Sequence, residues 1–158
     1  MNSLELRGVM PSDLSFFFEH QRDPVAVHMA AFTAADPDDR AAFDTHWSRI
    51  LAEKTVTIRT ILVDDQVAGS VLSYEQDDKL DVSYWIGREF WGKGIATQAL
   101  AEFLTIQTHR PLYGRAAKDN VGSVKVLLKN GFRIVGEEKG FANARGREIP
   151  ELILMLDG

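Results

Sequence analysis

The segment that decides the fold of this chain is YWIGREFWGKGIA, residues 84–96, in which an apolar strand meets a glycine turn and then a helix. Gly92, Gly94 and Ala96 keep side-chain bulk away from the backbone of the turn. The first N–H groups of a helix have no carbonyl partner within it and lie at the positive end of its dipole. The turn is therefore suited to bind the phosphate groups of a cofactor.

Length and composition indicate one folded domain. The chain has 158 residues, of which 45% are hydrophobic and 26% are charged. A domain of about 150 residues buries roughly 70% of the surface of its unfolded chain, which is enough for a sizeable core. No repeat, linker or low-complexity tract marks a boundary, so we expect a single domain over residues 1–158.

The same composition argues against several classes of function. The chain has no cysteine, which excludes disulfides, thiolate metal sites and thiol nucleophiles, and no metal-ligand spacing is found. A net charge of −5 and a pI of about 5.3 disfavour binding to nucleic acid or to an anionic membrane. With no signal-like or membrane-length apolar segment, we expect a cytoplasmic protein.

Hydrophobic spacing and turn residues predict a mixture of strands and helices. A first strand is expected over 4–9, and then helices that begin at Pro11, Pro24 and Pro37, the last capped by Asp36. Further strands are predicted at 56–63, 67–74, 80–86, 112–117, 132–137 and 148–156, with helices at about 96–104 and 120–129. This order favours a layered α/β or α+β sheet.

Two other phosphate-binding motifs do not match the glycine turn. The run Gly92–Thr97 lacks the third glycine of G-x-G-x-x-G, and no acidic residue follows at the distance typical of dinucleotide-binding folds. The chain also lacks the G-x-x-x-x-G-K-[ST] phosphate loop. The remaining alternative is that the small residues only let the helix pack closely on the sheet.

A second segment makes the pattern more specific. The turn Trp91–Ala96 and the segment Asn120–Ser123, which leads to Lys129–Phe132, together resemble the GNAT superfamily of acetyl-CoA-dependent N-acetyltransferases. The resemblance covers nearly the whole chain and is strongest to the branch similar to ribosomal-protein N-terminal acetyltransferases. Gly94 and Ala96 match the signature Q/R-x-x-G-x-G/A, but Trp91 stands at its Gln/Arg position. Backbone amides would then bind the pyrophosphate.

The resemblance implies a GNAT fold, a mixed and twisted central sheet flanked by helices. Acetyl-CoA would enter between the strand that ends near Ile86 and the strand at 112–117. Turn amides would bind the pyrophosphate, the strand would pair with the pantetheine arm, and basic side chains would add charge near the phosphates. The cofactor contacts implied are Val82, Ser83, Tyr84, Trp85, Ile86, Arg88, Trp91, Gly92, Lys93, Gly94, Ile95, Ala96, Asn120, Ser123 and Lys125.

The implied reaction is direct attack of a neutral primary amine on the acetyl thioester, without an acyl-enzyme. Ser123 is the candidate general acid for the departing thiolate, and Glu75 is the first candidate base, with Asp81 second. Each carboxylate has the alternative interpretation of a plain charge at a strand end. Asn120 has two compatible interpretations, a contact to the CoA arm and a helix N-cap.

The resemblance favours a protein or peptide N-terminal amine as acceptor and leaves small amines open. The rival hypothesis is a non-catalytic acyl-CoA-binding sensor or interaction module that keeps the cofactor turn. The last strand could pair across a two-fold axis, so both a monomer and a homodimer are compatible with the sequence.

Overall fold

The computed structural model describes residues 3–158, which form one seven-stranded sheet in the order β1-β2-β3-β4-β5-β7-β6. The strands are β1 (Leu4–Arg7), β2 (Thr57–Val63), β3 (Gln66–Gln76), β4 (Lys79–Ile86), β5 (Leu112–Ala117), β6 (Arg133–Ala142) and β7 (Arg147–Leu156). The helices are α1 (Asp13–Gln21), α2 (Pro24–Ala30), α3 (Arg40–Ala52), α4 (Ile95–Ile106) and α5 (Val121–Lys129), with a short 3₁₀ turn at Arg88–Phe90. None of the helices described is long and apolar enough to cross a membrane.

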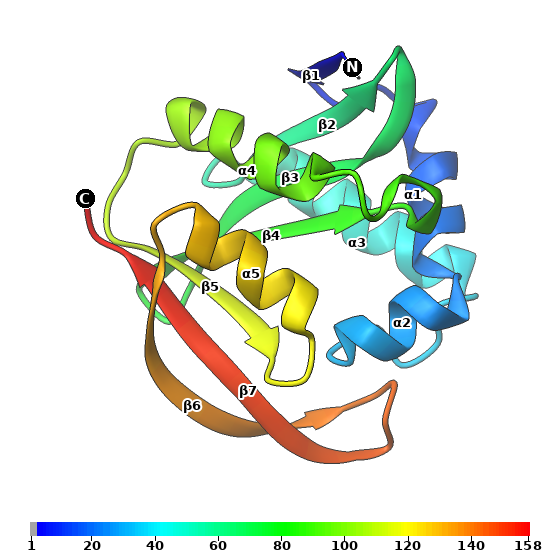
Figure 1. Cartoon of the computed structure of the whole chain (residues 1–158). Helices are drawn as coiled ribbons and strands as arrows, with labels where there is room; N and C mark the ends of the chain where they lie inside the picture. The colour runs from blue at the N-terminus through cyan, green and yellow to red at the C-terminus, as the bar shows by residue number, and fades with distance from the viewer. Residues whose placement is uncertain (1–2) are drawn as a thin grey trace.

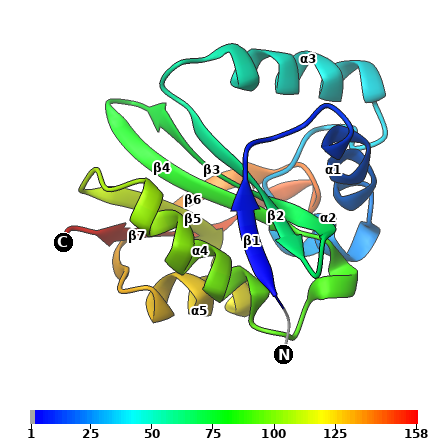
Figure 2. The same cartoon turned by 90° about the horizontal axis from the view of Figure 1, so that it is seen from above.

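Helices cover both faces of the sheet, with α4 and α5 on one face and α1 and α3 on the other (Figures 1 and 2). All neighbouring strands pair antiparallel except β4 and β5, which pair parallel. The predicted mixed α/β sheet flanked by helices is therefore confirmed.

The parallel pair β4–β5 is short, and the two strands diverge after it (Figure 1). Only Asp81 with Tyr113 and Val82 with Gly114 are in register, whereas β3 stays paired with β4 as far as Ile86. From Ser83 to Ile86, β4 therefore has a partner on one side only. The sheet opens at the position predicted from the sequence.

Two pairs of aspartates set the hairpins that bring β2, β3 and β4 together. Asp64 and Asp65 have φ values of 49° and 66°, and Asp77 and Asp78 have 52° and 63°. Two successive residues with positive φ form the turn that matches the right-handed twist of antiparallel strands, and aspartate tolerates this conformation well. Both turns lie in the gaps between the strands predicted at 56–63, 67–74 and 80–86.

The main core lies between the sheet and helices α4 and α5. Phe103 and Leu100 of α4 are buried against strand residues such as Ile61 and Leu154. Helix α5 packs closely on β5 at Gly114, where an added Cβ would lie 2.8 Å from Leu127 Cδ2. The absence of a side chain at Gly114 therefore lets α5 lie close to β5, next to the open part of the sheet.

Helix α3 begins at Arg40, so the predicted start at Pro37 with Asp36 as its cap is wrong. The N-cap is Asp39, whose carboxylate accepts the Ala42 N–H at 3.0 Å. Asp36 instead accepts the N–H of Asp38 at 3.0 Å within the preceding loop.

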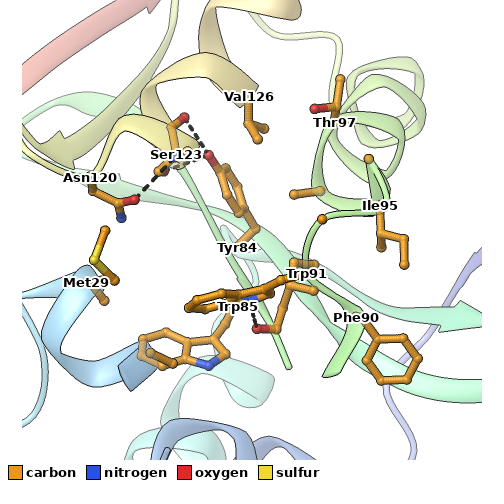
Figure 3. A pocket seen from close by; sticks show the side chains of 17 residues that line it. Met29, Tyr84, Trp85, Phe90, Trp91, Ile95, Thr97, Asn120, Ser123 and Val126 are labelled. Carbon is orange, nitrogen blue, oxygen red and sulfur yellow. Dashed lines mark hydrogen bonds between the residues drawn. The ribbon is translucent and has the colours of Figure 1, made fainter. Parts of the chain in front are cut away.

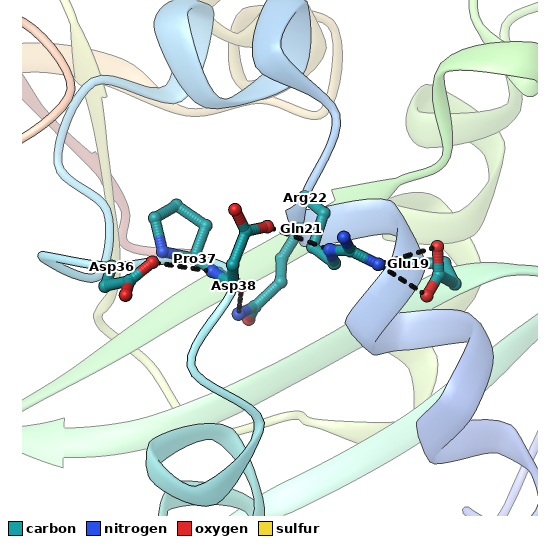
Figure 4. Close-up of polar contacts among 6 residues, drawn as sticks. All are labelled: Glu19, Gln21, Arg22, Asp36, Pro37 and Asp38. Atoms are coloured by element: carbon teal, nitrogen blue, oxygen red, sulfur yellow. Dashed lines mark hydrogen bonds and ion pairs between the residues drawn. The ribbon is translucent and has the colours of Figure 1, made fainter.

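The loop before α3 is held against the end of α1, which explains the late start of the helix (Figure 4). Gln21 Nε2 donates to the Pro37 carbonyl at 2.9 Å, and Arg22 Nε donates to Asp38 Oδ1 at 2.8 Å. These contacts depend on residues far apart in the sequence, so the local helix signal at Pro37 could not reveal them.

Strand β6 extends to Ala142, beyond the predicted end at Glu137. Its second half carries Glu, Lys and Gly residues, which have weak strand propensity, and it forms because it pairs with β7 from Gly136 to Ala142. The register shifts between Ile134 and Gly136, and such a bulge hides the alternating pattern of a strand.

Asp13 joins β1, α1 and β2 through a buried network. Its carboxylate accepts hydrogen bonds from Arg7 Nη1 at 2.7 Å, Arg7 Nη2 at 2.9 Å, the Met10 N–H at 2.8 Å and the Thr60 hydroxyl at 2.7 Å. Burial alone would raise the pKa of Asp13, but these hydrogen bonds outweigh burial and lower the pKa below its ordinary value.

Replacing Asp13 by asparagine should therefore lower the free energy of unfolding by about 3 kcal/mol at pH 7, because Arg7 loses its buried partner. The stabilisation is complete above the ordinary aspartate pKa of about 3.9 and disappears as the pH falls through the lower pKa of the folded state. Urea unfolding at pH 7 and in stronger acid measures both effects. The control Glu5→Gln, at an exposed carboxylate of β1, should change stability by less than about 0.5 kcal/mol. Equal stability of Asp13→Asn and wild type at pH 7 would contradict the role of this network.

Candidate functional site

A cavity of about 430 Å³ lies where β4, the glycine turn, α2 and α5 meet (Figure 3). Most of its lining side chains are apolar or small, and the polar groups come from a few positions on β4 and α5. The lining residues are Ala26, Met29, Ala30, Tyr84, Trp85, Ile86, Phe90, Trp91, Gly92, Gly94, Ile95, Ala96, Thr97, Asn120, Gly122, Ser123 and Val126. We call this space the turn cavity.

The glycine turn presents free backbone donors to the turn cavity. Gly92 and Gly94 have φ values of 76° and 73°, a conformation that glycine adopts without strain. No side chain caps α4, and within residues 3–158 no hydrogen-bond acceptor is found for the amides of residues 92–97. These N–H groups lie at the positive end of the α4 dipole, so they can bind an anion such as pyrophosphate.

Trp91 holds the turn against the end of β4. Its indole Nε1 donates to the Ile86 carbonyl at 2.9 Å, while 41% of the residue remains exposed. The residue at the Gln/Arg position of the signature thus positions the turn through the strand backbone. Because a tryptophan has no charge, the backbone amides are the groups at this end of the cavity that could bind an anion.

Ser123 lies at the other end of the turn cavity in a short hydrogen-bonded chain. Its N–H donates to Asn120 Oδ1 at 3.3 Å, so Asn120 is the N-cap of α5, as one of the two interpretations predicted. The Tyr84 hydroxyl lies 2.9 Å from Ser123 Oγ and also donates to the Ser123 carbonyl at 3.2 Å (Figure 3).

Tyr84, expected to contact the cofactor through its backbone, also brings a side-chain hydroxyl to the site. Burial raises the pKa of its phenol to about 12, although the hydrogen bond with Ser123 works in the opposite direction. The phenol therefore stays protonated at neutral pH and can support the Ser123 hydroxyl as a proton donor.

Three basic residues expected near the phosphates do not line the turn cavity. Arg88 forms an ion pair with Asp23 at 3.0 Å, which ties the turn to the N-cap of α2. Lys93 Nζ lies 5.9 Å from the centre of the Phe90 ring, and Lys125 is exposed on α5. Long side chains of this kind could still reach a bound phosphate, and that role stays a prediction.

A second cavity, of about 530 Å³, lies at the opening between β4 and β5 and is lined by residues from both faces of β4, and we call it the acidic cavity. Its polar lining includes Tyr74, Asp81, Ser83, Arg115 and Glu151. Val82 and Ser83, both expected to contact the cofactor, lie here rather than in the turn cavity. The two cavities share a lining at the open part of the sheet, which consists of Ala30, Tyr84, Trp85, Asn120 and Ser123.

The structure does not bring Glu75 together with Ser123. Glu75 is exposed, pairs with Leu80 beside the β3–β4 turn and lines neither cavity. Asp81, the second candidate, is buried and lines the acidic cavity. Of the two carboxylates, only Asp81 shares a cavity with Ser123.

A third and smaller cavity of about 180 Å³ lies between helices α1 and α3 and strands β3 and β4. It also reaches Ser83, Tyr84 and Trp85 but has no carboxylate in its lining, and we call it the neutral cavity. Burial lowers the pKa of His20 and His46, which line it, so both imidazoles are neutral at physiological pH.

Helix α2 forms a wall of the turn cavity through Ala26, Met29 and Ala30, whereas the sequence had placed the first helices on the acceptor side. The loop between β6 and β7 holds this wall, because Arg145 Nε donates to the His28 carbonyl at 2.8 Å. The same guanidinium binds Asp119 through two bonds of 2.8 and 3.1 Å, next to the cap of α5. Only the folded chain brings these segments together, so no local pattern could have identified the wall.

Comparisons with known proteins identify the family and the fold. The sequence profile described as Acetyltransferase (GNAT) domain matches residues 3–133. A search of curated protein sequences finds no match.

Solved structures share the fold at low sequence identity. RimJ of Mycobacterium smegmatis in complex with CoA-disulfide is 21% identical, with a TM-score of 0.82, over 98% of this chain and 82% of that one. The spermidine N-acetyltransferase of Vibrio cholerae in complex with CoA and spermine is 18% identical, with a TM-score of 0.76, over 96% and 95%. A phosphinothricin acetyltransferase of Sinorhizobium meliloti in complex with acetyl-CoA is 19% identical, with a TM-score of 0.82, over 98% and 88%.

The free amides of the turn give a prediction about CoA binding. Gly94→Gln and Gly94→Glu both place a side chain at a positive φ, which costs roughly 1–2 kcal/mol, and they differ only in charge. If phosphates bind at the turn, the glutamate variant should bind CoA at least about tenfold more weakly than the glutamine variant. Calorimetric titration measures both dissociation constants, and equal values would argue against a phosphate at this turn.

Proposed function

The chain belongs to the GNAT acetyltransferase family, and we propose that it transfers the acetyl group of acetyl-CoA to a primary amine by direct attack, without an acyl-enzyme. The observation that carries this proposal is the shared lining of the two larger cavities. There, the unpaired edge of β4 lies beside Ser123, and the turn cavity extends from it to the free amides of the turn. A cofactor in the turn cavity and an acceptor in the acidic cavity would meet at this place.

The cofactor would lie along the turn cavity. Its pyrophosphate would bind the amides of residues 92–97, and its extended arm would pair with the free edge of residues 83–86, as an added strand does. The side chain of Asn120 caps α5 through its oxygen, which leaves its amide nitrogen available as a donor to the arm.

In the proposed reaction, the amine nitrogen forms a bond to the thioester carbon, and the bond from that carbon to sulfur breaks. A backbone N–H of residues 83–85 would stabilise the oxyanion that forms between these events. Ser123 would give a proton to the departing thiolate, and the Tyr84 hydroxyl, 2.9 Å away, would replace it. A proton from solvent would then restore the Tyr84 phenol.

The amine must also lose a proton before it attacks. Glu75, the base predicted from the sequence, is exposed and outside the cavities, which argues against direct contact with the amine. Asp81 lies two residues from Ser83, about 7 Å along the strand. We therefore propose that water in the acidic cavity accepts this proton.

Two classes of acceptor are consistent with the site, a protein or peptide N-terminal amine and a small amine. Both larger cavities have lining residues at the open part of the sheet. Membership of the family does not select between the two classes of acceptor. The alternative function is a sensor or interaction module that binds acyl-CoA without turnover.

The proposed function is tested by titrating the protein with acetyl-CoA, with NAD as a control, and then measuring CoA release with a panel of amines. Binding of acetyl-CoA but not NAD, with turnover of an amine, would support the enzyme. Binding without any turnover would support the sensor, and the absence of binding by the folded protein would contradict both.

Ser123 and Tyr84 give a prediction about the chemical step. Ser123→Ala should lower kcat by about 100-fold with little change in acetyl-CoA affinity, because it removes the general acid. Ser123→Thr keeps a hydroxyl and should recover most of that loss. Tyr84→Phe should lower kcat by about tenfold, which corresponds to one hydrogen bond. Unchanged activity of Ser123→Ala would eliminate Ser123 as the acid.

A further inference from the structure

Asp81 is a buried carboxylate without an ion-pair partner in the part of the chain described. Burial raises its pKa, and the charges of Arg115 and Lys79 act in the opposite direction. Only 4% of its surface is exposed, and within residues 3–158 no hydrogen bond or ion pair to its side chain is found. A buried charge without a partner is costly unless something else supplies the partner. Because Asp81 lines the acidic cavity, a bound cation could supply it.

The cation nearest in the lining is already used elsewhere. Arg115 Nη1 lies 3.1 Å from Glu138 Oε2 and 3.4 Å from Glu151 Oε1, so two other carboxylates share its guanidinium. The charged residues of the acidic cavity are therefore two carboxylates, Asp81 and Glu151, and one guanidinium. The charged lining thus has a net negative charge, and Asp81 is its carboxylate without an ion pair.

Strand geometry places Asp81 at a defined distance from the proposed reaction centre. Asp81, Ser83 and Trp85 alternate along β4 and so lie on one face, where Tyr74 is the cross-strand partner of Asp81. The Cα atom of Asp81 is about 7 Å from that of Ser83 and about 13 Å from that of Trp85. A group bound at Asp81 would therefore lie several bonds away from the reacting nitrogen.

From this placement we propose that the acidic cavity binds an acceptor with two cationic groups, one of which is acetylated while Asp81 holds the other. The inference rests on the proposed acetyl transfer and narrows its acceptor. The shared chemistry is a second ammonium group separated from the reacting amine by a short chain, either in a small diamine or in a peptide with a basic side chain.

The neutral cavity gives the contrasting expectation. It reaches the same residues of β4, but its lining has no carboxylate and its two histidines are neutral. An acceptor with a single amine would have no reason to prefer the acidic cavity. A dependence on Asp81 that appears only with dicationic acceptors therefore distinguishes the two cavities.

The test compares 1,5-diaminopentane with pentylamine, which has the same chain and reacting group but lacks the second charge. In the wild type, kcat/KM should be about 10- to 100-fold higher for the diamine. Asp81→Asn should lower kcat/KM for the diamine to the value for pentylamine and should leave kcat/KM for pentylamine unchanged. The control Glu148→Gln removes an exposed carboxylate of β7 outside the three cavities and should change neither value.

A parallel pair of substrates identifies the source of the second charge, namely dipeptide amides with lysine or glutamine at the second position. The two dicationic acceptors, the diamine and the lysine peptide, are then compared. The one with the higher kcat/KM, provided that this value falls in Asp81→Asn, is the better model of the acceptor. An equal loss of activity with pentylamine would show that Asp81 acts as the base and would overturn the proposal. Insensitivity of both dicationic acceptors to Asp81→Asn would overturn it as well.

Direct binding separates this inference from the proposed function. Calorimetric titration of the CoA-bound protein with 1,5-diaminopentane and with the lysine peptide should show at least about tenfold weaker binding to Asp81→Asn for one of them. If binding is weaker to Asp81→Asn but the wild type acetylates none of the amines, the proposed acetyl transfer is contradicted and the cation site is still supported. If neither ligand binds to the wild type, the cation site is refuted.

Discussion

The structure depends on one constraint, that β4 has a partner strand on both sides only as far as Val82. Beyond it, β3 continues to pair with β4, but β5 turns away. On the side that faces β5, the backbone N–H and C=O groups of residues 83–86 are thus left without a strand partner, at the centre of a seven-stranded sheet. Unpaired backbone in such a place needs a hydrogen-bonding partner, and an extended ligand is the natural one.

The elements around this opening are fixed by contacts of different kinds. The glycine turn is tied to the strand end by the Trp91 indole and to α2 by the Arg88–Asp23 ion pair. Helix α5 is set close to β5 by Gly114 and is capped by Asn120. As a result, free amides lie at one end of the turn cavity and the Tyr84–Ser123 pair lies at the other.

Local signals in the sequence were enough to predict the parts of the fold that are local in origin. The aspartate turns, the glycine turn before α4 and the Asn120 cap each depend on a few adjacent residues. The start of α3, the length of β6 and the α2 wall depend on partners far along the chain. The same limit applies to the site. The contact between Tyr84 and Ser123 joins β4 to α5, and Glu75 is excluded by its place beside the β3–β4 turn, four residues along the strand pairing from Tyr84.

The central claim, that the free edge of β4 and the amides of the turn hold the cofactor, is tested most directly by amide hydrogen exchange with and without CoA. The account predicts that CoA slows exchange in residues 83–86 and 92–97 and leaves the paired strands β1 and β2 unchanged. If CoA binds but exchange in both of these segments stays the same, the cofactor lies elsewhere and the account is wrong.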